Sequence, residues 1–152
     1  MTPAVPPHPG ASTPAISARM STFPRRDTKP ELALRQLMHA SGRRYRVNYP
    51  IPARRRRTMD IAFTRSRVAI FIDGCFWHGC PQHGVLPVSN RAWWDHKIQV
   101  TKARDLDTTN ALLSAGWVVL RFWEHEPAEK MAATVTEALA LAGHRRHDLG
   151  PA

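Results

Sequence analysis

The sequence lacks the features of a membrane or secreted protein. No apolar run approaches the roughly 20 residues that span a bilayer, and two cysteines in 152 residues are too few to staple a secreted domain together. Residues 1–17 contain no lysine or arginine and no continuous apolar core, so we expect no signal peptide. No internal repeat is visible. These absences favour an intracellular protein with one packed core.

Acidic residues are also scarce, and the basic ones are unevenly placed. The chain has 22 Lys and Arg against 12 Asp and Glu, a net charge of +10. Residues 18–67 carry fourteen basic and three acidic side chains, a net of +11, and the remainder sums to −1. A GC-rich genome explains why arginine outnumbers lysine, but it does not explain this segregation. The segregation predicts one face that binds a polyanion such as nucleic acid.

Hydrophobic periodicity and turn residues predict one α/β domain with loose ends. Residues 1–17 contain five prolines and should be disordered, and residues 143–152 should form a flexible tail, which leaves a folded domain at 18–142. Thr28 and Glu31 have the spacing of a capping box. The expected elements are a helix from Thr28 to Gly42, a strand at 43–48, a Pro- and Arg-rich loop at 49–58, a hairpin of strands 59–63 and 67–72, a helix at 91–115, a strand at 117–123 and a helix at 127–141.

Chemically active side chains are concentrated between Asp73 and His83. This segment follows the apolar run Val68–Ile72, so a core strand should present it at its exit. Four Cys and His ligands suit a closed, structural zinc site, and the candidates are Cys75, Cys80, His83 and His125. Two alternatives stay open. Either His78 or His96 replaces the last of these ligands, or the two cysteines are simply buried free thiols.

A second group of side chains indicates acid–base chemistry with a divalent cation. Asp60 lies inside an apolar strand, where a buried and unpaired carboxylate is costly. A divalent cation at the edge of the sheet would remove that cost, and Asp73 at the end of the next strand offers a second carboxylate. His78 then lies within reach as the base that activates water. The alternative is that Asp60 pairs with one of the many arginines.

Two aromatic pairs are candidates for contact with bases. Phe76-Trp77 and Trp93-Trp94 lie in loop or helix-start positions, where aromatic rings can stack on bases or wedge between them. The alternative is that one member of each pair covers the core.

Basic segments are candidates for contact with phosphates. The most prominent run consists of Arg54, Arg55, Arg56 and Arg57. We expect it in a solvated loop, because four adjacent guanidinium groups are not buried together. Positive charge on the surface of the expected helix at 91–115 is a weaker indication, carried by Lys97, Lys102 and Arg104.

Taken together, these residues resemble the very short patch repair (Vsr) endonucleases, a branch of the PD-(D/E)XK nuclease superfamily. The similarity covers roughly residues 17–126, and its most specific piece is Gly74-Cys-Phe-Trp-His78. The other pieces follow in the order Met20, Arg26–Glu31, Met59–Ile61, Val68–Asp73, Trp93–Ile98, Arg104-Asp105 and Gly116–Glu124. The resemblance implies a restriction-endonuclease-like mixed sheet flanked by helices, with a structural zinc loop.

The resemblance also implies an activity. It is a magnesium-dependent nick in one strand of duplex DNA, 5′ of the thymine of a T:G mismatch. Such mismatches arise when 5-methylcytosine deaminates, which links the enzyme to a cytosine-5 DNA methyltransferase. By resemblance, Asp60 and the main-chain carbonyl of Ile72 hold Mg²⁺, His78 activates the attacking water, and Glu31 lies near the active site. The protein is then expected to be monomeric, bacterial, cytoplasmic and associated with the nucleoid.

DNA contacts follow from the same resemblance. Phe76, Trp77 and Trp94 correspond to aromatic residues that intercalate beside the mismatch from the major groove. Met20, in an N-terminal arm, would probe the minor groove. Further contacts are expected from Arg25, Arg26, Trp93, Lys97 and the arginines at 54–57.

Two features depart from the family's pattern. Asp73 stands where better-known members carry a second histidine, at the position of the superfamily's usual lysine. A carboxylate there either binds a second Mg²⁺, makes His78 more basic or weakens the enzyme. The zinc loop is rearranged, because Cys80 comes two residues early, His83 follows it and His125 replaces a cysteine. Two other functions stay open: a zinc-stapled protein that binds mismatches without cutting, and a restriction-like nuclease that cuts paired DNA.

Overall fold

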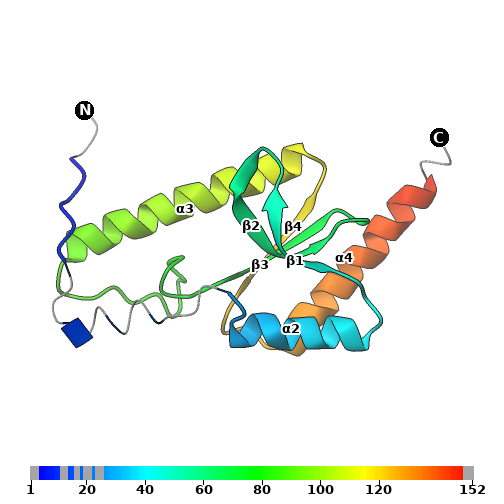
Figure 1. Cartoon of the computed structure of the whole chain (residues 1–152), viewed down its shortest axis with the longest axis horizontal. Coiled ribbons are helices and arrows are strands. Elements are labelled where there is room, and N and C mark those ends of the chain that lie inside the picture. The colour runs from blue at the N-terminus through cyan, green and yellow to red at the C-terminus, as the bar shows by residue number, and fades with distance from the viewer. Residues whose placement is uncertain (1–3, 11–13, 16–17, 19–21, 23–25, 149–152) are drawn as a thin grey trace.

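The computed structural model describes residues 4–10, 14–15, 18, 22 and 26–148. Its strands are β1 (Arg46–Ile51), β2 (Arg54–Phe63), β3 (Val68–Asp73) and β4 (Val118–Trp123), and the helices that cover them are α2 (Lys29–Ala40), α3 (Arg91–Ser114) and α4 (Ala128–Asp148). The four strands form one mixed sheet in the order β1-β2-β3-β4 (Figure 1), antiparallel except for the parallel pair β3–β4. The predicted α/β class, a mixed sheet flanked by helices, is confirmed.

The β3 strand is the centre of the fold. All six of its residues are buried, because helices cover both faces of the sheet, and a strand in that position needs a near-continuous apolar run. On one face it meets α2 and α4 in a cluster that includes Leu34, Met38, Ile61, Ile70, Phe122, Met131 and Val135. On the other face it meets the end of α3 in a smaller cluster that includes Ile51, Met59, Phe71 and Leu112. The predicted β2–β3 hairpin is confirmed, with Phe63 paired to Val68.

The α3 helix is longer than the sheet that supports it. It has 24 residues, and its first half reaches beyond the sheet and runs beside the loop that follows β3 (Figure 1). Close packing there requires a glycine, because a Cβ at Gly79 would lie 2.8 Å from the side chain of Ile98. Among the described residues no helix is long and apolar enough to cross a membrane.

The Arg-rich segment is a strand, not the loop that the sequence predicts. The β1 strand extends to Ile51, and a tight turn leads directly into β2, where the arginine run begins. Its backbone pairs with β1, while the guanidinium groups of Arg54 and Arg57 both donate to Asp107 of α3. The prediction failed because this end of β2 leaves Arg55 and Arg56 exposed while Arg54 and Arg57 pair with Asp107, so a strand here does not require the four arginines to be buried together.

Element boundaries also differ from the prediction at the first strand and at the last helix, and the expected helix cap is not formed. The first strand begins at Arg46 rather than at residue 43, and α4 continues past Leu141 to Asp148. The side chain of Thr28 makes no capping hydrogen bond, and Glu31 accepts the N–H of Asp27 instead. The capping box is therefore wrong in detail, although the helix begins where expected. The proposed domain boundaries near residues 17 and 142 stay predictions.

Arg57→Ala should destabilise the protein, whereas Arg56→Ala should not. Arg57 donates to Asp107 and to the hydroxyl of buried Thr108 at 3.0 Å, while Arg56 is exposed. We expect the melting temperature to fall by about 2–4 °C for Arg57→Ala, as losing one charge-assisted hydrogen bond does in a domain of this size. Thermal denaturation followed by circular dichroism measures the difference. Equal shifts for both variants would contradict the assignment.

Candidate metal and catalytic sites

The parallel pairing of β3 and β4 decides where the candidate sites lie. Asp73, the last residue of β3, pairs with Trp123, the last residue of β4. Because parallel strands end at the same edge of a sheet, the two following segments leave side by side. The N–H of Glu124 donates to the carbonyl of Asp73 at 3.0 Å, and the Glu124 carboxylate accepts the N–H of Cys75 at 2.9 Å. This edge brings His125 to the cysteine loop.

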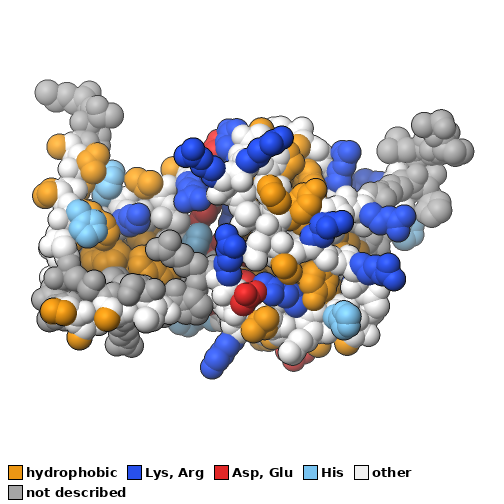
Figure 2. Space-filling view, viewed as in Figure 1, with side chains coloured by type: hydrophobic (Ala, Val, Ile, Leu, Met, Phe, Trp, Pro, Cys, Tyr) orange, Lys and Arg blue, Asp and Glu red, His pale blue; other side chains and the backbone are white. Residues whose placement is uncertain are grey.

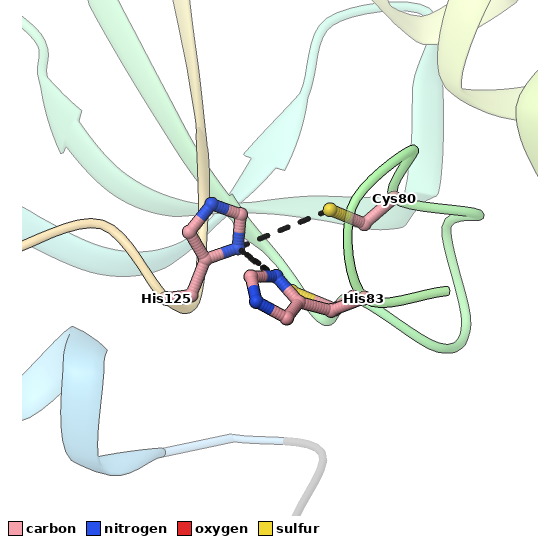
Figure 3. A group of neighbouring side chains, drawn as sticks. Cys80, His83 and His125 are labelled. Carbon is pink, nitrogen blue, oxygen red and sulfur yellow. Dashed lines mark hydrogen bonds between the residues drawn. The ribbon is translucent and has the colours of Figure 1, made fainter. Parts of the chain in front are cut away.

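Four side chains at this edge form a candidate metal centre, and they are the four that the sequence predicts. The ligand atoms of Cys75, Cys80, His83 and His125 all lie within 4.8 Å of one another. Nδ1 of His125 is 3.1 Å from Sγ of Cys75, 3.9 Å from Sγ of Cys80 and 3.1 Å from Nδ1 of His83 (Figure 3). One ring nitrogen cannot hydrogen-bond to all three groups. A tetrahedral zinc ion, in contrast, requires ligand atoms about 3.3–3.8 Å apart.

The loop that carries these ligands closes through its main chain. The N–H of Cys80 donates to the carbonyl of Cys75, and the N–H of Gly84 donates to the carbonyl of Cys80, both at 2.8 Å. A Cβ at Gly84 would lie 2.6 Å from that second carbonyl oxygen, so only glycine fits. Burial and the neighbouring Cys80 raise the pKa of the Cys75 thiol to about 11. A bound zinc ion favours the thiolate and would lower it.

Asp60 projects from β2 toward the main chain of β3. Its Oδ2 accepts the N–H of Ile72 at 2.8 Å, and among the described residues no arginine pairs with it. Burial raises the pKa of Asp60 to about 6, and the charges of Glu31 and Asp73 raise it further. The hydrogen bond from Ile72 and the charge of His78 act in the opposite direction. The structure therefore brings Asp60, Ile72, Glu31 and His78 together, as the sequence analysis expects.

His78 has a carboxylate partner that the sequence analysis missed. Its Nδ1 lies 2.6 Å from Oδ2 of Asp105 in α3 and 3.7 Å from Oδ1 of Asp73. An ionised carboxylate only accepts hydrogen bonds, so Nδ1 carries the proton and Nε2 is left with a lone pair. Burial opposes the charged imidazole, but the hydrogen bond that His78 donates to Asp105 and the charges of both aspartates outweigh it and raise the pKa of His78.

Asp73 is the partner of Arg121 in β4, a second residue that the sequence analysis missed. Nη1 of Arg121 lies 3.1 Å from each carboxylate oxygen of Asp73. Burial raises the pKa of Asp73, although His78 and Arg121 both favour its ionised form. A signal was present in the sequence, because an arginine inside an apolar strand needs a partner just as an aspartate does.

Comparison with known proteins identifies the family. Residues 13–83 match the family model described as DNA mismatch endonuclease Vsr. The chain is 41% identical over 130 residues to the type II nicking enzyme V.NaeI of Lentzea aerocolonigenes, covering 84% of this chain and 78% of that protein. The chain belongs to the Vsr family. It is also 33% identical over 112 residues to the DNA mismatch endonuclease Vsr of Escherichia coli K12, covering 71% of this chain and 68% of that protein.

A third relative is, like the first, a type II nicking enzyme by name. The Vsr-family chain is 39% identical over 104 residues to the type II nicking enzyme V.XorIIP of Xanthomonas oryzae pv. oryzae, covering 66% of this chain and 73% of that protein. Members of the Vsr family act on DNA, so the prediction of a DNA endonuclease is confirmed at that level.

The aromatic pairs of this Vsr-family chain form one cluster outside both hydrophobic cores. Ring centroids of Phe76 lie 5.1 Å from those of Trp77 and Trp94, and Trp93 is 4.7 Å from Trp94. All four side chains are half-buried. The alternative that one member of each pair fills the core is therefore wrong, and the cluster joins the loop after β3 to the first turn of α3.

The basic residues fall into two groups. Arg54 and Arg57 are engaged with α3, whereas Arg26, Arg55, Arg56 and Lys97 are exposed. Figure 2 shows Lys and Arg side chains over the sheet and the α4 side, and hydrophobic atoms around the first half of α3. Met20 and Arg25 lie outside the described residues.

Replacing a member of the candidate metal centre should remove bound zinc. We expect His125→Ala to weaken zinc binding by more than about tenfold and to lower the melting temperature, because metal binding stabilises the fold it closes. His96→Ala is the matched control, since His96 lies in α3 and is not among the four ligands. Elemental analysis and titration with a zinc indicator give the stoichiometry. An unchanged zinc content in His125→Ala would reject this ligand set.

Asp60→Asn should stabilise the metal-free protein near neutral pH. The pKa of Asp60 is raised to about 6 on folding, so the folded state holds a proton that the unfolded state releases above about pH 4. Its contribution to stability is present below pH 4 and lost as pH rises through 6. The variant should match the wild type at pH 4 and exceed it by up to about 3 kcal/mol at pH 7.

Urea denaturation without divalent cations at both pH values measures this difference. Asp95→Asn, an exposed position on α3, controls for the change of one carboxylate to an amide. A difference between Asp60→Asn and wild type that does not change with pH would contradict the expectation.

Proposed function

We propose that this protein is a magnesium-dependent endonuclease that nicks one strand 5′ of the thymine of a T:G mismatch and so begins very short patch repair. One observation carries the proposal. The Asp60 carboxylate accepts the N–H of Ile72 at 2.8 Å, and the next residue of β3, Asp73, lies 3.7 Å from Nδ1 of His78, so both groups lie at the same end of β3.

The metal-binding part of the proposal rests on Asp60 and on the main chain of β3. The carboxylate of Asp60 and the carbonyl of Ile72 would hold the cation. The negative charge of Glu31 nearby adds to the charge that a cation would neutralise. Bound Mg²⁺ would neutralise charge on the phosphate oxygens. Zinc is proposed for the separate centre formed by Cys75, Cys80, His83 and His125, because that donor set is the one zinc prefers.

The proton transfer is assigned to His78. Its Nδ1–H is fixed by Asp105 at 2.6 Å, so Nε2 is the atom that accepts a proton from the attacking water. The carboxylate holds the ring in one orientation and stabilises the imidazolium that forms. This arrangement favours cleavage over the alternative of a protein that only binds mismatches.

Mismatch recognition is assigned to the aromatic cluster and binding of the DNA backbone to the exposed cations. Phe76, Trp77, Trp93 and Trp94 form a group of edge-to-face and tilted rings beside the loop that carries His78. A mispaired step is easier to open than a paired one, so inserted rings gain more contact there than they lose in base stacking. Arg26, Arg55, Arg56 and Lys97 are exposed and available to phosphates.

The biological setting follows from the substrate. T:G pairs arise where 5-methylcytosine deaminates, so we infer a functional link to a cytosine-5 methyltransferase. The metal centre and the catalytic residues come from one chain, which supports action as a monomer on DNA in the bacterial cytoplasm. A second candidate is nicking of fully paired DNA. It is favoured by the names of the relatives V.NaeI and V.XorIIP, which are called nicking enzymes without mention of a mismatch.

The test compares nicking of end-labelled duplexes that differ only in one pair, T:G, T:A or C:G, with Mg²⁺ present. We expect cleavage only at T:G and a loss of about 10²–10⁴-fold for His78→Gln, the usual contribution of a general base. Asp60→Asn should abolish nicking. His144→Gln and Glu137→Gln, both exposed on α4, should cleave like wild type.

Each outcome distinguishes between the candidates. Equal rates on T:G and paired duplexes would replace mismatch repair with restriction-like nicking. Binding of T:G DNA without any nick would favour the non-cleaving alternative. Full activity of Asp60→Asn would remove the proposed cation site.

A further inference from the structure

The guanidinium of Arg121 connects three elements next to the proposed catalytic residues. Its Nη1 donates to both oxygens of Asp73 at 3.1 Å, its Nε donates to Oγ1 of Thr109 at 3.0 Å, and its Nη2 donates to the carbonyl of Asp105 at 3.2 Å. The flat face lies 4.3 Å from the centre of the Phe71 ring. Every nitrogen of the group is therefore directed at an acceptor within the protein.

Two of these contacts hold the turn of α3 that supplies the partner of His78. Asp105 and Thr109 are one helical turn apart, and Arg121 bonds to both. The carboxylate of the same Asp105 lies 2.6 Å from Nδ1 of His78. Arg121 thus fixes the position of that carboxylate relative to the sheet.

The third contact, the ion pair with Asp73, keeps that carboxylate from competing with Asp105 for the Nδ1–H group of His78. Asp73 is buried, and its Oδ1 lies only 3.7 Å from the Nδ1 that Asp105 already engages. One N–H group cannot serve two carboxylates. A buried carboxylate without a partner is costly, so without Arg121 the nearest compensating group for Asp73 would be the imidazole of His78.

We propose that Arg121 is a positioning residue of the catalytic site, which holds Asp73 in an ion pair so that Asp105 alone orients His78. The inference rests on the proposed function, since it assigns His78 the role of base. It also gives Asp73 a role other than binding a second cation. Arg121 is not a phosphate ligand, because its donors are already directed at Asp73, Thr109 and Asp105.

The decisive experiment combines Arg121→Gln with Asp73→Asn. Single-turnover nicking at saturating T:G duplex should fall by about 100-fold in Arg121→Gln, the cost of displacing a catalytic group by about 1 Å. The double variant Asp73→Asn/Arg121→Gln should recover to within about tenfold of wild type, because the competing charge is gone. The nicking rate of Asp73→Asn alone should also stay within about tenfold of wild type. The affinity of every variant for the uncut duplex, measured without divalent cations, should change by less than about threefold.

Four results would overturn the proposal. Arg121 would only hold α3 against the sheet, with no effect through Asp73, if the double variant is as slow as Arg121→Gln. It would be a DNA ligand if Arg121→Gln weakens binding but keeps its rate at saturation. Asp73 would be a metal ligand if Asp73→Asn alone is as inactive as Asp60→Asn. Arg121 would have no positioning role if Arg121→Gln nicks at the wild-type rate. Arg65→Gln, an exposed change at the far end of the β2–β3 hairpin, is the matched control.

A readout without cleavage separates this inference from the proposed function. The ¹⁵N and ¹H signals of the His78 ring report its hydrogen bond to Asp105 in DNA-free protein, and they should change in Arg121→Gln and return in the double variant. Unchanged His78 signals in Arg121→Gln would overturn the proposal even if wild type nicks DNA. If Arg121→Gln does not fold, Arg121→Met takes the place of Arg121→Gln in every comparison, because methionine keeps an apolar side chain next to Phe71.

Discussion

The parallel pairing of β3 with β4 is the interaction on which both candidate sites depend. It places the last residues of the two strands opposite each other, Asp73 beside Trp123, and so brings together segments 50 positions apart in sequence, such as Cys75 and His125. The contact between Glu124 and the N–H of Cys75 fixes the start of the loop. A shift of one residue would turn each side chain to the opposite face, and the metal centre and catalytic group would be lost together.

The candidate metal centre and the proposed catalytic histidine share one loop, and this would explain why a structural site lies so close to a reactive one. Cys75 and Cys80 flank His78 in sequence, and the N–H of His78 donates to the carbonyl of Gly74 at 3.1 Å. Ligands on both sides limit the movement of the residue between them. The role proposed for His78 requires the imidazole to be held within a fraction of an ångström, which an irregular loop achieves only when it is fixed at several points.

Sequence patterns predicted the parts of the molecule that depend on local order. The β2–β3 hairpin, α3 and the loop ligands Cys75, Cys80 and His83 were found because each follows from spacing along the chain. His125 was named only from its place just past the last expected strand, with His78 and His96 as alternatives. The strand identity of Arg54–Arg57 was missed, since it depends on pairing with β1 and on Asp107. The partners of His78 and Asp73 were missed for the same reason, because Asp105 and Arg121 lie 27 and 48 residues away. Nothing in local periodicity specifies such distant pairings.

The charges at the proposed catalytic edge support a cation site there, even in a Vsr-family chain with a net charge of +10. Asp60 lies near Glu31 and Asp73, and its pKa is raised to about 6 by burial and by their charges. Arg121 compensates Asp73, and Arg35 contacts Glu31, but among the described residues no cationic side chain pairs with Asp60. A phosphate approaching this edge meets an uncompensated carboxylate. A divalent ion bound to Asp60 would remove the repulsion and the cost of burial at once, so the arrangement that destabilises the free protein is also what makes the site selective for metal and phosphate together.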